Sequence, residues 1–188
     1  MDRYLELRLR LDPELVPQHL LNGLYTRLHR VLVQLGSQDI GVSFPVYDDL
    51  KPNLGNRMRL HGSEAALQAL MSTSWLNGMF DHLDMTSIRP VPQDTRYRQV
   101  SRVQAKSSPD RLRRRAMRRH GLDQQAAERR IPNSAAERLQ LPYVTLGSRS
   151  TGQPAFPLFI RHGPLLSSPV AGAFNSYGLS HEATIPWF

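Results

Sequence analysis

The sequence predicts an α+β fold. Two features of the 188 residues indicate it. The first half alternates between segments with the two-residue period of a strand and segments with the 3.6-residue period of a helix, and the second half joins a strongly basic helix to short extended segments. With 40% hydrophobic residues, the chain has a composition near that of globular proteins and can bury a core.

In the first half, strands are predicted where apolar and polar residues alternate, and helices where apolar residues recur on one arc. Gly36 follows the longer helix at a position suited to its end, and Ser63 precedes the shorter one. The predicted elements are strand 4–10, helix 17–35, strand 41–44, strand 57–61, helix 64–71 and an extended segment 85–91. This β-α-β-β-α-β order is that of a ferredoxin-like (RRM-like) domain, predicted for residues 1–94.

A domain boundary is predicted near residues 92–95, where the charge balance changes. Residues 1–94 carry 9 basic and 11 acidic side chains, whereas residues 95–188 carry 15 and 5. Of the 24 basic residues, 22 are arginine, whose planar guanidinium binds phosphate or a guanine edge in two-point fashion. The distribution predicts a polyphosphate partner for the second domain; a generally arginine-rich composition with a solvated basic face is the alternative.

The second domain, residues 95–188, is predicted to be an α+β nucleic-acid-binding domain with an arginine-rich helix at about 109–120. Ser108 is suited to the N-cap of that helix, Pro109 to its first position, and Gly121 to its end. The other predicted elements are an extended segment 97–106, helices 123–130 and 134–139, and short strands at 143–146, 156–161, 174–179 and 184–188.

Several functional classes are excluded or disfavoured. The absence of cysteine excludes disulfide scaffolds, thiolate nucleophiles and cysteine-based zinc sites. No segment has the apolar length of a membrane span and the first ten residues do not resemble a signal peptide, so a cytoplasmic protein is expected. The cluster Asp81-His82-Leu83-Asp84 is more typical of a surface turn than of a metal site, and neither a metal nor another cofactor is expected.

The arginine-rich helix is the strongest functional signal. Five arginines cover an arc of about 140°, and too few acidic residues lie nearby to pair with them. We interpret the arc as a surface that lies in a nucleic-acid groove; a loose basic helix or a localisation signal is the alternative. The five are Arg111, Arg114, Arg115, Arg118 and Arg119. Arg102 and Gln104, two residues apart in an extended segment, share one face and are candidates for reading base edges.

Other side chains are candidates for a functional site. His29 lies beside the leucine arc, on an accessible flank of its helix, although an ordinary surface histidine fits the same pattern. Ser148, Ser150 and Thr151 place three hydroxyls on a glycine-flanked turn, where they suit a ribose or phosphate or simply bond local backbone. Phe156 and Tyr177 could stack on bases, although packing in the core is the commoner use of such rings.

The chain resembles the CRISPR RNA-processing endoribonuclease of type I-F systems, the Csy-subtype repeat-cleaving enzyme. The resemblance covers essentially the whole chain. It rests on MDRYLELRLR at the start, GVSFP (41–45), YRQVSRVQAKS (97–107), RLRRRAMRRH (111–120), RIP (130–132), LPYVTLGSRSTGQ (141–153), LFIRHGPL (158–165), and YGLS and PWF near the end.

The resemblance implies roles for single residues. His29 corresponds to the family's catalytic histidine, Ser148 to its ribose-positioning serine, and Tyr177 to its active-site tyrosine. Arg102 and Gln104 correspond to the base-reading pair, and Phe156 to the aromatic that stacks under the closing base pair of the hairpin. The groove-inserting arginines correspond to Arg114, Arg115, Arg118 and Arg119.

The resemblance also implies a reaction and partners. The enzyme would bind the hairpin of a CRISPR repeat and cut precursor RNA at the 3′ base of the stem without a metal, by attack of the RNA's own 2′-hydroxyl. It would then remain bound to the product as a subunit of the surveillance complex used in antiviral defence. A non-catalytic hairpin-binding subunit is the main alternative, and a duplex-DNA-binding regulator is disfavoured because no compact helix-turn-helix is predicted.

Overall fold

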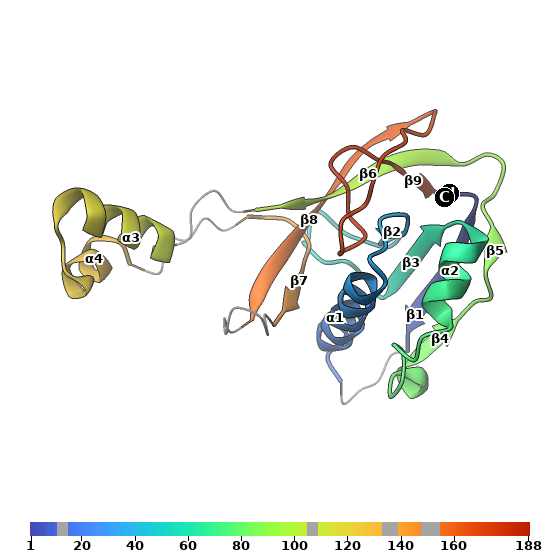
Figure 1. The fold of residues 1–188 in the computed structure, drawn as a ribbon, viewed down its shortest axis with the longest axis horizontal. Coiled ribbons are helices and arrows are strands. Elements are labelled where there is room, and N and C mark those ends of the chain that lie inside the picture. Colours follow the sequence, from blue (N-terminus) through green and yellow to red (C-terminus); the bar gives the residue numbers. More distant parts are fainter. Residues whose placement is uncertain (11–14, 105–108, 133–138, 148–154) are drawn as a thin grey trace. The chain divides into compact units, whose positions relative to one another are not determined.

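The computed structural model describes residues 1–10, 15–104, 109–132, 139–147 and 155–188, and it confirms the α+β class (Figure 1). The contacts between residues divide the chain into two compact units. The first unit joins residues 1–103 to residues 141–188, and the second consists of residues 104–140.

The first unit begins with an antiparallel sheet in the order β2-β3-β1-β4, with β5 also paired to β1. Its helices α1 and α2 follow β1 and β3 along the chain, and both contact β1. The elements are β1 (Arg3–Leu9), α1 (Pro17–Leu35), β2 (Gly41–Ser43), β3 (Arg57–Gly62), α2 (Glu64–Met71), the 3₁₀ turn η1 (Phe80–His82), β4 (Leu83–Met85) and β5 (Arg89–Pro90). The extended segment predicted over 85–91 is therefore two short strands that pair with different ends of β1.

A second antiparallel sheet in the same unit has the order β7-β8-β6-β9. Its strands are β6 (Arg96–Val103), β7 (Tyr143–Leu146), β8 (Phe156–Leu166) and β9 (Ile185–Trp187). Buried residues alternate with more exposed ones along β7 and the first half of β8, so one face of the sheet is covered and the other faces outward.

Helix α1 explains how the two sheets share one core. Leu24, Leu28 and Leu32 of the predicted arc are buried, whereas Leu20 is half-buried and Leu35 is exposed at the end of the helix. The helix contacts both β1 and β7. The buried side chains of both sheets belong to one hydrophobic cluster around this helix. Gly36 ends α1 in the left-handed conformation (φ 60°), as the sequence predicts.

The strand predicted over 174–179 is wrong. Residues 174–179 form a loop, because Gly178 adopts a positive φ of 69° and the Asn175 side chain accepts hydrogen bonds from the backbone of Tyr177 and Leu179. A side chain that bonds its own backbone competes with a strand ladder, which makes asparagine a turn former.

The second unit contains the arginine-rich helix. Helix α3 (Pro109–His120) matches the predicted bounds, and α4 (Gln124–Arg130) begins after Asp123, whose side chain caps it. The predicted cap Ser108 and most of the predicted helix 134–139 lie outside the described residues. Arg113 Nε donates to the carbonyl of Ile131 at 2.9 Å, which joins α3 to the end of α4.

Two buried histidines give the first unit a pH-dependent stability. Burial lowers the pKa of His61 and of His162 to about 3, with Arg59 and Arg98 as the next causes. Below about pH 6.5 these histidines take up protons in the unfolded chain, whereas in the folded protein they do not. Their contribution to the free energy of unfolding is therefore fully present above that pH and is lost as the pH falls toward 3. Each histidine contributes a slope of about 1.4 kcal/mol per pH unit in this window.

We therefore expect urea unfolding to show the protein several kcal/mol less stable at pH 5.0 than at pH 7.5. His162→Gln should roughly halve the pH dependence, whereas His19→Gln, a change at an exposed position on α1, should leave it unaltered. Equal stability of the native protein at the two pH values would contradict the assignment.

Candidate active site

His29 is held in one orientation on the flank of α1. Its ring is half-buried beside the leucine arc, and its Nδ1 lies 2.9 Å from the backbone carbonyl oxygen of Ser176. A carbonyl oxygen can only accept a hydrogen bond, so Nδ1 carries the proton and donates. In the neutral ring the lone pair then lies on Nε2, which is the form that a general base requires.

The ring of Tyr177 covers one face of the His29 imidazole. The two rings stack with centroids 4.1 Å apart and planes inclined by 13°. One turn before His29 on α1, the buried Tyr25 hydroxyl donates to the backbone carbonyl of Tyr177 at 2.7 Å. Burial raises the pKa of Tyr25 well above its usual value, so this hydroxyl keeps its proton and remains a donor. Helix α1 thus binds two successive carbonyls of the loop.

The loop itself is fixed from both ends. The Asn175 side chain holds the turn, the Val42 amide of β2 donates to the carbonyl of Gly178 at 2.8 Å, and the Ser180 amide donates to the carbonyl of Val100 on β6 at 2.9 Å. These bonds tie the loop to a strand of each sheet. Tyr177 is therefore held against His29 by a loop that hydrogen bonds fasten at both ends.

The side chain of Arg102, on β6, lies beside Tyr177. Its guanidinium carbon lies 5.5 Å from the centre of the Tyr177 ring and 6.0 Å from that of Phe156 on β8. The structure thus brings together four residues that the sequence singled out, from a helix, two strands and a loop. A histidine base beside a guanidinium and two aromatic rings can accept a proton, offset phosphate charge and stack on a base.

Known proteins match the whole chain. The family model described as CRISPR-associated protein (Cas_Csy4) matches residues 4–188. The chain belongs to this family. Two relatives are named CRISPR-associated endonuclease Cas6/Csy4, and each aligns over all 188 residues and the full length of both chains. The relative from Pseudomonas aeruginosa (strain UCBPP-PA14) is 53% identical and that from Escherichia coli (strain UTI89 / UPEC) is 48% identical. The resemblance drawn from the sequence is confirmed.

In this member of the Cas_Csy4 family, the arginine arc of α3 is the exposed face of the helix. All five predicted arginines are exposed, whereas Leu112, Ala116 and Met117 on the opposite side are half-buried. Within the described part of the chain, Arg115, Arg118 and Arg119 form no salt bridge. Three unpaired cations on one side of a helix suit an external polyanion.

Of the remaining predicted site residues, the structure describes Gln104. Gln104 is exposed at the start of the second unit. Ser148, Ser150 and Thr151 lie outside the described residues, so their predicted roles remain predictions. Residues 143–146 and 156–166, which come before and after these three in the sequence, are adjacent paired strands.

Sequence reasoning missed the residues that orient the histidine. Tyr25 follows the apolar arc and reads as core, and its hydroxyl gains a partner only because a loop 152 positions away reaches it. Asn175 and Gly178 gave a usable local signal, since asparagine followed by glycine three residues later is typical of a turn.

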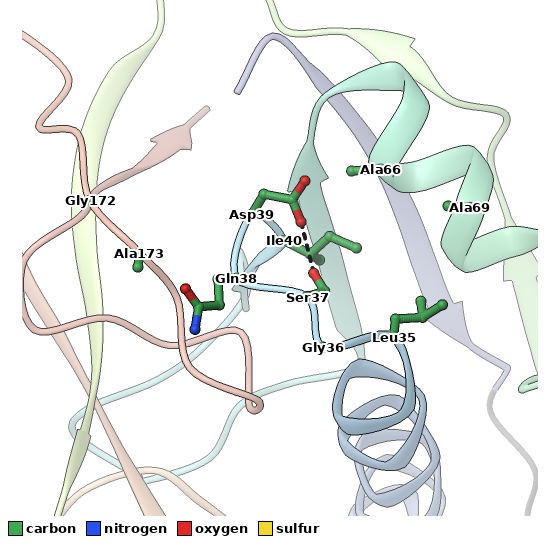
Figure 2. Close-up of a pocket in the computed structure, with 10 residues that line it drawn as sticks. All are labelled: Leu35, Gly36, Ser37, Gln38, Asp39, Ile40, Ala66, Ala69, Gly172 and Ala173. Carbon is green, nitrogen blue, oxygen red and sulfur yellow. Dashed lines mark hydrogen bonds between the residues drawn. The ribbon is translucent and has the colours of Figure 1, made fainter.

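A pocket at the C-terminal end of α1 is lined by none of the predicted site residues (Figure 2). Ser37 donates to Asp39 at 2.8 Å at its rim. Its lining consists of Leu35, Gly36, Ser37, Gln38, Asp39, Ile40, Ala66, Ala69, Gly172 and Ala173. The described residues contain no group of three or more histidine or carboxylate side chains that could hold a metal ion, and no helix among them is long and apolar enough to cross a membrane.

Proposed function

We propose that the protein is a metal-independent endoribonuclease that binds the hairpin of a CRISPR repeat and cuts precursor RNA at the 3′ base of the stem. The observation that carries the proposal is the orientation of His29, whose Nδ1 is committed to Ser176 so that Nε2 is available as a base. Membership of a family whose relatives are named CRISPR-associated endonucleases supports the same conclusion.

The proposed domain boundary, between residues 94 and 95, separates the part of the chain with the proposed base from the part that binds RNA. Residues 1–94 are a ferredoxin-like domain, which the strand order β2-β3-β1-β4 and the two helices after β1 and β3 support. Residues 95–188 bind the RNA and contain α3. His29, the proposed base, and the arginines of α3, which bind the RNA in this proposal, therefore come from different halves of the sequence.

The proposed reaction uses the nucleophile of the RNA. His29 Nε2 removes the proton of the 2′-hydroxyl beside the scissile phosphate, and the 2′-oxygen forms a bond to phosphorus while the bond from phosphorus to the 5′-oxygen breaks. The products are a 2′,3′-cyclic phosphate and a 5′-hydroxyl. The leaving 5′-oxygen takes a proton from water, and His29 returns the proton that it has taken up to the solvent, so that charge and protons balance.

The other site residues position the substrate in this proposal. Ser148 holds the ribose so that the 2′-oxygen is in line, and Phe156 stacks under the closing base pair. Arg102 and Gln104 read base edges near the cut. The arginines of α3 lie in the groove of the stem, and Ser150 and Thr151 bind the backbone beside it.

The same grip accounts for the proposed fate of the product. An arginine face that holds the stem continues to hold it after the cut, because the stem lies on the 5′ side of the scissile bond. The protein then stays on the mature RNA as a subunit of the type I-F surveillance complex in antiviral defence.

Incubation of the protein with a repeat hairpin in EDTA tests the proposal. We expect a single cut at the 3′ base of the stem, with a cyclic phosphate on the upstream product. Replacing the 2′-hydroxyl at that position by hydrogen should abolish cleavage and leave affinity nearly unchanged. Binding without cleavage of the all-ribose hairpin would favour a non-catalytic binding subunit, and cleavage of the deoxy hairpin would exclude 2′-hydroxyl attack.

Variants of the residues proposed to bind phosphate and of those proposed to read bases should differ in how salt changes their affinity for RNA. Arg115→Ala and Arg118→Ala should weaken binding to any hairpin of similar shape and lower the salt slope by about one unit each. Arg102→Ala and Gln104→Ala should instead reduce preference for the cognate base pairs near the cut, by about 1–3 kcal/mol each.

The measurement is a titration at several salt concentrations, with a cognate hairpin and one whose lowest pairs are swapped. An unchanged salt slope for the α3 variants, or an equal loss of affinity for both hairpins with Arg102→Ala, would contradict the proposal. It would show that phosphate binding and base reading are assigned to the wrong residues.

A further inference from the structure

Helix α1 binds the outer edge of β7 through two side-chain amides. Among the described strands, β7 pairs only with β8, so its outer backbone groups need other partners. Gln18 Nε2 donates to the carbonyl of Tyr143 at 3.0 Å and to Asn22 Oδ1 at 3.1 Å. Asn22 Oδ1 also accepts from the amide of Thr145 at 2.9 Å. We call Gln18 and Asn22 the edge clamp.

The register of the sheet agrees with these bonds. Ile160 on β8 donates to the carbonyl of Pro142, and in an antiparallel pair the residues that bond across the ladder alternate with those that do not. The carbonyl of Tyr143 and the amide of Thr145 therefore point away from β8. Pro157, opposite Thr145, has no amide hydrogen and so suits a position that does not bond across the ladder. The edge clamp supplies the partners that β8 does not.

Each amide of the edge clamp has one possible orientation. The carbonyl of Tyr143 can only accept, so Gln18 presents its Nε2 to it. The amide of Thr145 can only donate, so Asn22 presents its Oδ1. In these bonds Gln18 is a donor and Asn22 an acceptor. A carboxylate can therefore replace Asn22 but not Gln18, which gives the two positions opposite expectations.

The edge clamp connects the two elements that carry the proposed base and the proposed stacking ring. Asn22 lies seven residues before His29 on α1, so at about 100° per residue the two side chains leave nearly the same side of the helix. On the strand, Thr145 precedes Leu146, which pairs with Phe156 on β8. The bond from Asn22 to Thr145 therefore joins the helix of His29 to the strand pair of Phe156.

The leucines of α1 hold the helix in the core by a different kind of interaction. Leu21, Leu24 and Leu28 are buried, whereas Gln18 and Asn22 are half-buried. Burial of apolar surface has no preferred direction, so it keeps the helix against the core without fixing its position along β7. A hydrogen bond requires a narrow range of distance and angle and does fix that position. Loss of the edge clamp is therefore expected to shift the helix against β7 rather than to unfold the protein.

We propose that Asn22 is a positioning residue for cleavage, and that its bond to the Thr145 amide sets the distance between His29 and the RNA bound by the second sheet. Gln18 supports it by holding the Asn22 amide and the neighbouring carbonyl of Tyr143. The inference rests on the proposed function, since it concerns the rate of the proposed cut. Neither residue of the edge clamp contacts RNA in this proposal, so the chemical step depends on them more than affinity does.

The test is single-turnover cleavage of the repeat hairpin by variants of the edge clamp. Asn22→Leu removes the acceptor and is expected to slow cleavage by about 10- to 100-fold, with affinity for the deoxy hairpin within about threefold. Asn22→Asp keeps an acceptor oxygen and should cut within about threefold of the native rate. Gln18→Glu adds the same negative charge one turn away but places an oxygen against the Tyr143 carbonyl, so it should be slowed by about tenfold.

Thr26→Val is the matched control. Thr26 Oγ1 donates to the backbone carbonyl of Asn22 at 2.7 Å, a bond within α1 itself, so this variant should cut at the native rate. Hydrogen exchange of the Thr145 amide tests the edge clamp without RNA. We expect this amide to be protected in the native protein and in Asn22→Asp, and to exchange at least about tenfold faster in Asn22→Leu.

Urea unfolding establishes that each variant is folded at the assay temperature. A folded Asn22→Leu protein that cuts at the native rate, or equal rates for Asn22→Leu and Asn22→Asp, would overturn this inference. If Asn22→Leu does not fold, the comparison of Asn22→Asp with Gln18→Glu takes its place, and equal rates for these two would overturn the inference. A native protein that does not cut the hairpin would instead contradict the proposed function.

Discussion

His29→Ala is expected to slow cleavage of the repeat hairpin by about 10²–10⁴-fold, while the dissociation constant stays within about threefold. The reason is that Nε2 serves proton transfer, whereas binding depends on the arginines of α3 and the residues that read the bases. Single-turnover cleavage with enzyme in excess measures the chemical step, and a filter-binding titration with the deoxy hairpin measures affinity.

A second histidine on α1 provides the control. His19 is exposed nearly three turns before His29, so His19→Ala removes an imidazole from the same helix without touching the Ser176 and Tyr177 contacts. Its cleavage rate should equal that of the native protein. A His29→Ala rate within about threefold of the native rate would remove His29 from the mechanism.

Gly178→Ala is expected to produce the second large effect, although residue 178 touches no substrate in the proposed reaction. A Cβ at this position would lie 2.4 Å from Cγ2 of Val42, a fully buried side chain, and the φ of 69° is unfavourable for any residue with a side chain. The loop must then shift, and it carries both the Ser176 carbonyl and the Tyr177 ring that orient His29. A displacement of about 1 Å at a catalytic group can cost about 10² in rate.

The matched control separates strain from displacement. Gly36 has nearly the same backbone conformation, with φ of 60°, and nothing lies within 4 Å of a Cβ built there. Gly36→Ala should therefore cost about 1–2 kcal/mol in the free energy of unfolding and leave the cleavage rate unchanged. Gly178→Ala should lower both stability and rate, with affinity for the deoxy hairpin retained. A native cleavage rate for Gly178→Ala would show that the loop does not control the geometry of His29.

The periodic elements could be predicted because their signals are local. The leucine arc of α1 and the arginine arc of α3 repeat every three to four residues, so the sequence alone indicated which side is buried and which is exposed. His29 was recognisable as a flank residue for the same reason. The loop at 174–179 was mistaken for a strand, although Asn175 and Gly178 favour a turn.

The sequence by itself determined the fold class, the bounds of the main helices, the basic face of α3 and the family to which the chain belongs. Only the tertiary structure decided how His29 is oriented, because the Ser176 carbonyl and the Tyr177 ring lie almost 150 positions away along the chain. Contacts between distant segments depend on how whole elements pack, which no local period encodes.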